Sequence, residues 1–245
     1  MTLIDKNDNI FIAGYKGMVG SAIKRSLEKR NYKNLLTPSR RELDLLNFNS
    51  VEQWFKEHKP SLVILAAAKV GGIEANNRYP GDFILENLKI QSNVIENAWR
   101  FNTKRFLFLG SSCIYPKFSE QPIKEEYLLR GVLEQTNEPY AIAKIAGIKL
   151  CSALKKQYNF DAISLMPTNL YGPGDNYHEK DSHVMPALIK KIHDSKRLNI
   201  PEVVCWGSGN PRREFLHVDD LADAAIFVLE DVSSDNKLLK DENSE

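Results

Sequence analysis

The stretch that decides the fold is Ile10-Phe11-Ile12-Ala13-Gly14-Tyr15-Lys16-Gly17-Met18-Val19-Gly20, an apolar run that leads directly into spaced glycines. The run predicts a buried strand, and apolar residues at four-residue spacing (Val19, Ile23, Leu27) predict a helix over 18–30. Glycines at a strand-to-helix junction let the backbone approach a pyrophosphate, and the helix start offers free N–H groups. We therefore expect a dinucleotide here, the alternative being a glycine-rich turn without ligand.

The alternation of strand and helix continues along the chain. Further apolar runs predict strands over 34–37, 62–66, 105–109 and 162–166, and amphipathic stretches predict helices near 50–58, within 82–101 and over 138–157. Near-continuous apolar strands separated by helices are typical of a parallel sheet covered on both faces. The expected fold class is α/β, a doubly wound, Rossmann-like parallel sheet.

Composition excludes several classes of partner. The 245 residues include 33 basic and 32 acidic side chains, so no nucleic acid is expected as a partner. No apolar stretch approaches the roughly 20 residues that span a bilayer, and the N-terminus lacks the apolar core of a signal peptide. Three widely spaced cysteines indicate neither a disulfide framework nor a metal site. We expect a cytoplasmic protein that does not bind membranes.

The segment after strand 34–37 bears on the choice of dinucleotide. NAD-binding folds often place a carboxylate there to hold the ribose 2′-hydroxyl, but this chain has Ser39-Arg40-Arg41. Cations at Arg40 and Lys16 suit a 2′-phosphate, which favours NADP; solvated surface arginines are the alternative. Asp44 is placed either to reach the adenine or to start a helix.

A hydride-transfer site is indicated by Ser111, Tyr140 and Lys144. Ser111 follows strand 105–109, and Tyr140 and Lys144 lie four residues apart on one helix face. We expect the lysine ammonium to lower the tyrosine pKa from its usual value near 10, and Ser111 to hydrogen-bond the reacting oxygen. Cys113 adds a thiol that could remove a proton from carbon next to a ketone, although a small buried core cysteine is the alternative.

These residues resemble the extended short-chain dehydrogenase/reductase family over nearly all of 8–231, and within it the members that make GDP-L-fucose. The matching segments are 14–20, 66–73, 110–116, 140–144, 167–173, 182–188, 206–209 and 212–215. The resemblance implies an NADPH-dependent enzyme that epimerises GDP-4-keto-6-deoxy-D-mannose at C3 and C5 and then reduces C4. It makes Cys113 the carbon base and His183 its acid partner; an ordinary helix-start histidine is the alternative.

The resemblance also assigns binding residues. Those expected to contact the cofactor are Gly14, Tyr15, Lys16, Gly17, Met18, Val19, Gly20, Arg40, Asp44, Leu109, Gly110, Ser111, Ser112, Lys144, Pro167, Thr168, Asn169, Leu170 and His183. Lys191, Trp206 and Arg213 are expected to contact the sugar nucleotide, with Trp206 either stacked on guanine or packed in a small core. A homodimer is expected through the helices within 82–101 and 138–157.

Beyond Pro167 the pattern loosens. We expect a loop over 169–175, a helix over 183–195, a short strand over 203–206 and a helix over 218–230. This gives an NADP-binding domain (1–166), a substrate-binding segment (167–215), a returning helix of the first domain (216–232) and a polar tail (233–245).

Members of the family continue beyond the last of these helices, so we expect a small, incomplete substrate domain. Two alternatives stay open. One is an epimerase or reductase for another GDP-sugar, such as a heptose. The other is a truncated, catalytically silent NADP-binding protein.

Overall fold

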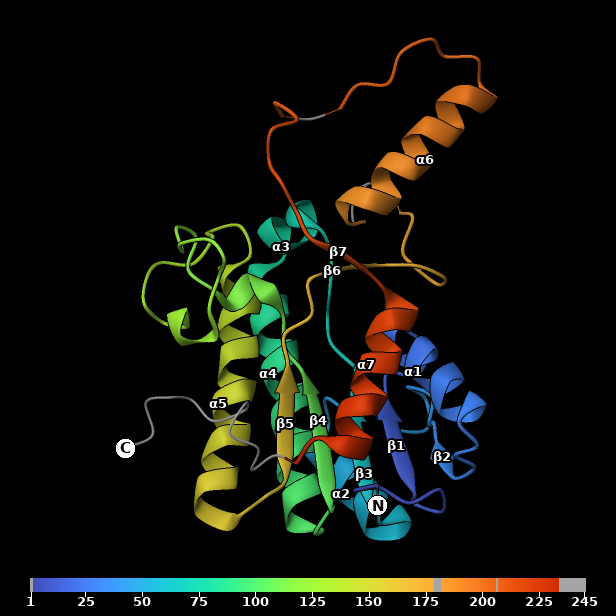
Figure 1. Cartoon of the computed structure of the whole chain (residues 1–245), viewed down its shortest axis with the longest axis vertical. Helices are drawn as coiled ribbons and strands as arrows, with labels where there is room; N and C mark the ends of the chain where they lie inside the picture. Colours follow the sequence, from blue (N-terminus) through green and yellow to red (C-terminus); the bar gives the residue numbers. More distant parts are fainter. Residues whose placement is uncertain (1, 179–181, 206, 234–245) are drawn as a thin grey trace.

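A five-stranded parallel sheet forms the centre of the computed structural model, which describes residues 2–178, 182–205 and 207–233 (Figure 1). The strand order is β2-β1-β3-β4-β5. The strands are β1 (Ile10–Ala13), β2 (Leu35–Leu36), β3 (Leu62–Leu65), β4 (Arg105–Leu109) and β5 (Ala162–Leu165). Every pairing in the sheet is parallel, so all five carboxyl ends meet at one edge.

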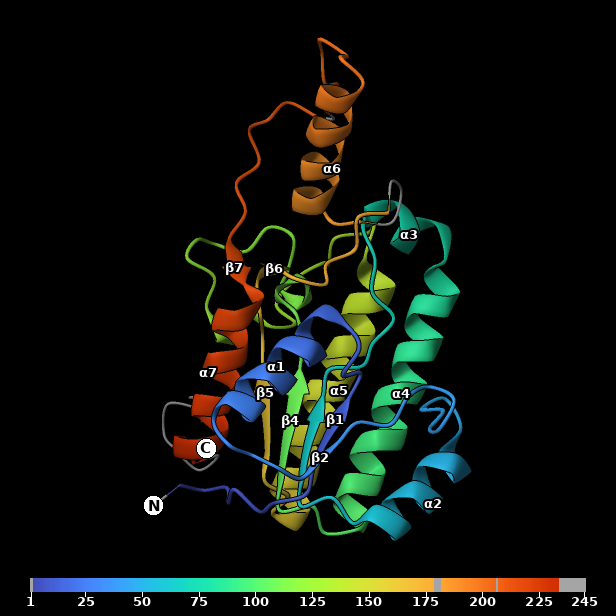
Figure 2. The ribbon, with the colours of Figure 1, turned by 90° about the vertical axis from the view of Figure 1, so that its right-hand side faces the viewer.

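Helices cover both faces of the sheet (Figure 2). One face carries α1 (Met18–Lys29) and α7 (Val218–Asp231), and the other carries α2 (Phe48–His58), α4 (Pro80–Arg100) and α5 (Glu138–Tyr158). Successive residues of a strand point to opposite faces, so Ile10 and Ile12 pack with α1 and α7 whereas Phe11 and Ala13 pack on the other face. The predicted doubly wound α/β fold is confirmed.

The topology places a switch point beside β1. Strand β2 pairs with one edge of β1 and β3 pairs with the other, so the chain moves to one side of β1 for β2 and then to its other side for β3. Open α/β sheets bind ligands outside the carboxyl ends of the strands at such a switch point. The short helix α3 (Ile73–Arg78) and the 3₁₀ turns η1 (Ser112–Ile114) and η2 (Glu125–Tyr127) follow carboxyl ends of β3 and β4.

A second, two-stranded sheet differs from the expectation for the region after Pro167. Strand β6 (Asn169–Tyr171) pairs in parallel with β7 (Phe215–His217), so the prediction of a loop at 169–171 was wrong. The strand predicted over 203–206 was also wrong for Val203–Cys205, which are not in a strand. Val204 is 74% exposed. In the described ranges no strand pairs with residues 203–205, so this apolar run does not become part of a sheet.

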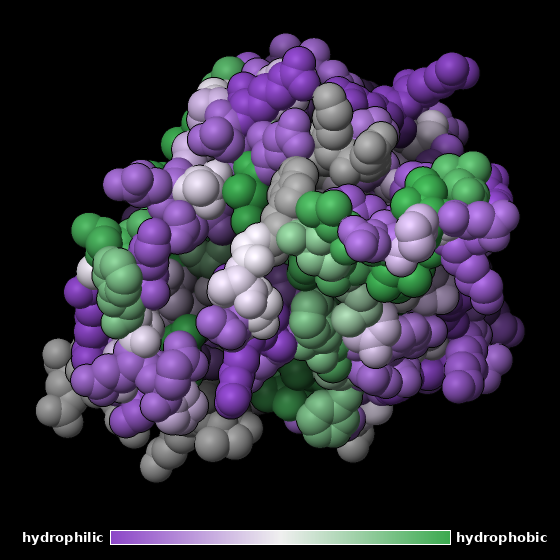
Figure 3. Space-filling model, turned by 90° about the horizontal axis from the view of Figure 1, so that it is seen from above, coloured by the Kyte–Doolittle hydropathy of each residue, from purple (hydrophilic) through white to green (hydrophobic). Residues whose placement is uncertain are grey.

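Helix α6 (Val184–Arg197) stands away from the sheet beyond its carboxyl edge (Figures 1 and 2). Several of its apolar side chains are exposed, including Val184, Ile189 and Ile192. Hydrophobic side chains are visible at the surface when the molecule is seen from this end (Figure 3). No helix in the described ranges is both long and apolar enough to cross a membrane.

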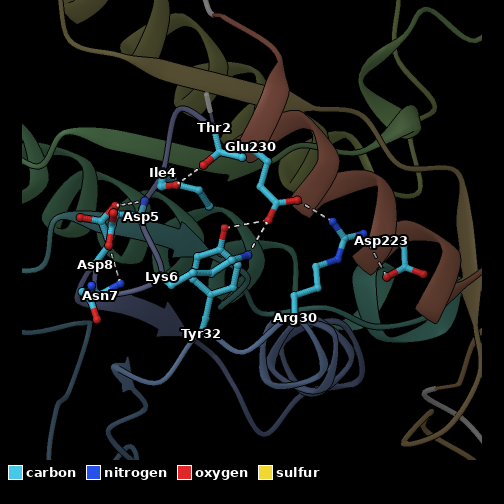
Figure 4. A network of polar contacts seen from close by, with 10 residues as sticks. All are labelled: Thr2, Ile4, Asp5, Lys6, Asn7, Asp8, Arg30, Tyr32, Asp223 and Glu230. Atoms are coloured by element: carbon cyan, nitrogen blue, oxygen red, sulfur yellow. Dashed lines mark hydrogen bonds and ion pairs between the residues drawn. The ribbon is translucent and has the colours of Figure 1, made fainter.

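The opposite end of the molecule is tied together by a polar network around Glu230 (Figure 4). Its carboxylate accepts hydrogen bonds from Tyr32 Oη (2.8 Å), Lys6 Nζ (3.0 Å) and Arg30 Nη1 (2.6 Å). The backbone carbonyl of Glu230 also accepts from the Leu3 N–H at 2.7 Å. The network therefore joins the N-terminal segment, the end of α1 and the end of α7.

Candidate active site

The glycine loop between β1 and α1 is shaped by close backbone contacts. Gly14 has φ +88°, and a Cβ there would lie 2.7 Å from the Ala67 Cα at the end of β3. A Cβ at Gly20 would lie 2.2 Å from the Gly14 carbonyl oxygen. At Gly17, the N-cap of α1, a Cβ would meet only that same oxygen, at an ordinary 3.4 Å. The outer glycines are therefore required by packing, whereas Gly17 borders open space.

This open space fits a dinucleotide pyrophosphate. Helix α1 begins at Met18 without an acidic residue in its first turn, so its partial positive charge faces the opening unopposed by a carboxylate. Lys16 and Gly17 are exposed beside it. Bare backbone in front of a helix start is the feature that binds phosphate groups in nucleotide-binding folds.

The turn after β2 places charged groups near the same opening. The pKa of Glu42 lies below its usual value, first because its carboxylate accepts from the Ser39 N–H and further because of the Lys16 charge. Arg40 is exposed on this turn. Asp44 is exposed too, and its Oδ1 accepts from the Leu46 N–H at 3.1 Å, which gives it a local turn-forming role.

The predicted hydride-transfer residues gather at the carboxyl end of β4. The Lys144 ammonium is buried and donates to the carbonyl of Leu109, the last residue of β4, at 2.7 Å. It lies 5.7 Å from the centre of the Tyr140 ring on the same face of α5. Ser111 caps η1, where its Oγ accepts from the Cys113 N–H at 3.4 Å. Local structure thus brings Ser111, Cys113, Tyr140 and Lys144 into one cluster.

Burial dominates the acid–base properties of this cluster. It lowers the pKa of Lys144 to about 8, against the opposing charge of Cys113. It raises the pKa of the Cys113 thiol, which hydrogen bonding with Ser111 and the charge of Lys144 partly offset. It also raises the pKa of Tyr140, and the charge of Cys113 adds to this while hydrogen bonding with Ser111 opposes it.

The predicted direction of the Tyr140 pKa shift was therefore wrong. The four-residue spacing correctly placed Lys144 near Tyr140, but the buried ammonium is directed to the Leu109 carbonyl. Desolvation of the phenol therefore has the largest effect on the Tyr140 pKa, and it raises that pKa.

His183 is the exposed N-cap of α6. Its charge lowers the pKa of Asp175 against a larger opposing effect of burial. Its pairing with Cys113 as acid and base stays a prediction.

The predicted substrate residues lie on α6 and on the segment 198–214, which connects α6 to β7 and is called the arm below. Lys191 Nζ donates to the Val204 carbonyl at 3.0 Å, which fixes the arm against the helix. Arg213 is exposed and donates to the Arg212 carbonyl at 2.7 Å. Trp206 falls outside the described residues.

The predicted cofactor segment 167–170 leads from β5 into β6. The Pro167 carbonyl accepts from the Ser112 N–H at 3.1 Å, beside the predicted catalytic cluster. Leu109 and Gly110 lie on the adjacent strand end, where the Gly110 N–H donates to the Leu165 carbonyl at 2.7 Å. The segment therefore lies next to the hydride-transfer residues, as a nicotinamide pocket requires.

Comparison with known proteins shows which family the chain belongs to. Residues 10–238 match the model of the NAD dependent epimerase/dehydratase family. The chain belongs to this family. It is 58% identical over 229 residues to GDP-L-fucose synthase 1 of Arabidopsis thaliana, covering 94% of this chain and 71% of the relative. It is 57% identical over 221 residues to the GDP-L-fucose synthase of Escherichia coli (strain K12), covering 90% and 69%.

Solved structures share the fold of this chain. A GDP-6-OMe-4-keto-L-xylo-heptose reductase from C. jejuni superposes with a TM-score of 0.89 at 38% identity, covering 99% of this chain and 77% of that one. A GDP-L-fucose synthetase from Naegleria fowleri bound to NADP gives 0.83 at 30% identity, covering 93% and 75%. The resemblance inferred from the motifs is confirmed.

Two buried polar residues of this epimerase/dehydratase were missed in the sequence. Asn87 accepts from the Lys69 N–H (2.9 Å) and donates to the Lys69 carbonyl (3.0 Å), which fixes the segment beside the glycine loop. Gln91 donates to the carbonyl of Ala143, next to Lys144, at 2.6 Å. Both follow Phe83 at four-residue spacing on the buried face of α4, and polar residues on such a face were the available signal.

Proposed function

We propose that this chain is an NADPH-dependent epimerase-reductase that converts GDP-4-keto-6-deoxy-D-mannose to GDP-L-fucose by epimerising C3 and C5 and reducing C4. The observation that carries the proposal is the Cys113 thiol inside the Ser111–Tyr140–Lys144 cluster. A plain reductase needs no such thiol. The identity of 57–58% to GDP-L-fucose synthases supports the same reaction for this chain.

Reduction uses the residues at the end of β4 and on α5. Ser111 and Tyr140 hydrogen-bond the C4 oxygen, and Tyr140 gives it a proton as the carbonyl becomes an alcohol. The charged Lys144, anchored on the Leu109 carbonyl at 2.7 Å, favours loss of that proton from the phenol. Bound NADPH supplies the hydride. The open backbone at Gly17 and the cations Lys16 and Arg40 would hold the NADPH.

Epimerisation uses Cys113. Its thiolate removes the proton from a carbon next to the C4 ketone, and the resulting negative charge on O4 is stabilised by Ser111 and Tyr140. A protonated His183 returns a proton to the opposite face of that carbon.

The experiment supplies GDP-4-keto-6-deoxy-D-mannose with NADPH and identifies the sugar formed. We expect GDP-L-fucose from the wild type and an unepimerised GDP-6-deoxy sugar from Cys113→Ser, because the serine hydroxyl is too weak a base. The other free cysteines offer a control, since the exposed Cys205→Ser should leave the product unchanged.

Three outcomes would contradict the proposal. Fucose formed by Cys113→Ser would show that Cys113 is not the base. Turnover of a GDP-4-keto-heptose in preference to the 6-deoxy sugar would favour the heptose alternative. Binding of NADPH without its consumption would favour a silent binding protein.

A homodimer and a cytoplasmic location belong to the same proposal. Helices α4 and α5 pack together and expose Leu85, Ile142 and Tyr158, which offer apolar surface for a second copy. The three cysteines are free, which suits a reducing compartment. Sedimentation at equilibrium would test the dimer, and a monomer at micromolar concentration would contradict it.

A further inference from the structure

Two consecutive side chains, Thr168 and Asn169, hold the same backbone oxygen. Thr168 Oγ1 donates to the Glu214 carbonyl at 2.9 Å, and Asn169 Nδ2 donates to it at 3.0 Å. Glu214 is the last residue of the arm before β7. Both donors are therefore directed to the arm, although the sequence assigned these residues to the cofactor.

The backbone around this anchor is fixed as well. Asn169 pairs with Phe215, Leu170 with Leu216 and Tyr171 with His217 in the parallel β6–β7 ladder. Gly172 follows with φ +145°, and a Cβ there would lie 2.7 Å from Val218 Cγ1 at the start of α7. The root of the arm is thus held from Thr168 to Gly172, whereas Gly207 and Gly209 higher in the arm would accept a Cβ without contact.

The same short segment also contacts the catalytic turn. The Pro167 carbonyl accepts from the Ser112 N–H at 3.1 Å, one residue from Cys113. On the other side of the anchor, the exposed Arg213 directly precedes Glu214. Residues 167–169 therefore link the reacting centre to Arg213, which is expected to contact the sugar nucleotide (Figure 1 shows β6 and β7 side by side above β5).

We propose that Thr168 and Asn169 are positioning residues that set the place of the Arg213 guanidinium relative to Cys113 by jointly holding the Glu214 carbonyl. Through the arm, their side chains act on the GDP-sugar. The inference rests on the proposed function, because Arg213 is a substrate ligand only in that reaction.

The test compares Thr168→Val, which removes the hydroxyl donor at nearly constant volume, with Thr168→Ser, which keeps it. We expect Thr168→Val to raise the KM for the GDP-4-keto sugar about two- to tenfold, as loss of one hydrogen bond does, with a smaller change in kcat. The KM for NADPH should change less than that for the GDP-sugar. Thr168→Ser should restore the KM of the sugar substrate. Asn169→Ala provides a second variant with the same expected direction.

Calorimetry with GDP alone separates this inference from the proposed function. The wild type should bind GDP, and Thr168→Val should weaken that binding about two- to tenfold, whether or not the keto sugar is turned over. In a double-mutant cycle, Thr168→Val should add little to the loss of GDP affinity caused by Arg213→Ala, because the first acts through the second. Additive losses, an effect confined to NADPH, or no GDP binding by the wild type would each overturn the inference.

Discussion

Lys144 is buried at the end of β4 with its ammonium on the Leu109 carbonyl, and burial lowers its pKa to about 8. It is charged below that pH and neutral above it. Because the charged form opposes the effect of burial on Cys113 and favours loss of the Tyr140 proton, we expect kcat/KM for C4 reduction to fall above about pH 8. The pH dependence of kcat/KM for the GDP-4-keto sugar, recorded at saturating NADPH, measures this decline.

Two substitutions identify Lys144 as the group that titrates. Lys144→Arg keeps a charge at every accessible pH. We expect it to be less active than the wild type, but its activity should not decline above pH 8. Lys144→Gln has no charge to lose and should give a low, flat profile. An alkaline decline near pH 8 that survives in Lys144→Gln would assign the titration to another residue.

At the residue scale, the sequence predicts those site residues whose positions follow from local structure. Ser111 and Cys113 lie just beyond a strand end, and Tyr140 and Lys144 share a helix face, so parallel strand order is sufficient to bring them together. The sequence does not predict the raised pKa of Tyr140, because desolvation depends on what packs over the phenol. The position of His183 depends on where α6 lies, which no local pattern specifies.

Helix α5 approaches the sheet closely at Gly147. A Cβ there would lie 2.5 Å from Phe108 Cζ and 2.9 Å from Gln91 Oε1, and both side chains are buried. We expect Gly147→Ala to lower the free energy of unfolding by about 1–3 kcal/mol, because the crowding outweighs the better helix propensity of alanine. Since α5 carries Tyr140 and Lys144, reductase activity should fall as well. Denaturant unfolding followed by circular dichroism measures the first effect.

Gly81→Ala is the matched control for this prediction. Gly81 lies in the first turn of α4, and a Cβ there would meet nothing within 4 Å. Its replacement should leave stability unchanged or raise it by up to about 1 kcal/mol. Equal destabilisation by both substitutions would show that packing at Gly147 is not the cause.

At the element scale, the long helices and central strands could be predicted because their apolar spacing repeats over many residues. The helix predicted over 138–157 is α5, and the strand predicted over 105–109 is β4. Strands β6 and β7 could not be predicted, because each has only three residues. Each forms only by pairing with the other, across the 43 intervening residues 172–214. The run Val203–Cys205 carries a strand-like composition without such a partner.

The Glu230 network connects three parts of the whole molecule (Figure 4). Burial alone would raise the pKa of its carboxyl, but hydrogen bonds from Tyr32 and Lys6, with Arg30, hold that pKa below its usual value. A lowered carboxyl pKa contributes stability above the unfolded-state value of 4.5, and this stability is lost as the pH falls through the folded-state value.

We therefore expect Glu230→Gln to destabilise the chain at pH 7 by about 1–3 kcal/mol, since three donors lose a charged acceptor. The difference from the wild type should begin to shrink below about pH 4.5, where Glu230 of the unfolded chain becomes protonated, and should be lost below the lower folded-state pKa. Thermal unfolding at pH 7 and pH 4 measures both. Asp231→Asn removes the same charge from the adjacent exposed residue and should have little effect at either pH. A difference between Glu230→Gln and the wild type that does not depend on pH would contradict the assignment.

The segment 167–169 has a consequence for which changes the chain can accept. Its first residue bonds the catalytic turn, and its next two bond the arm, with no residue between them. The separation of these two attachments is therefore set by covalent chain length. An inserted or deleted residue would force one attachment to break, whereas a side-chain replacement removes a single bond. Variation at this place should take the form of substitution and not of a change in length.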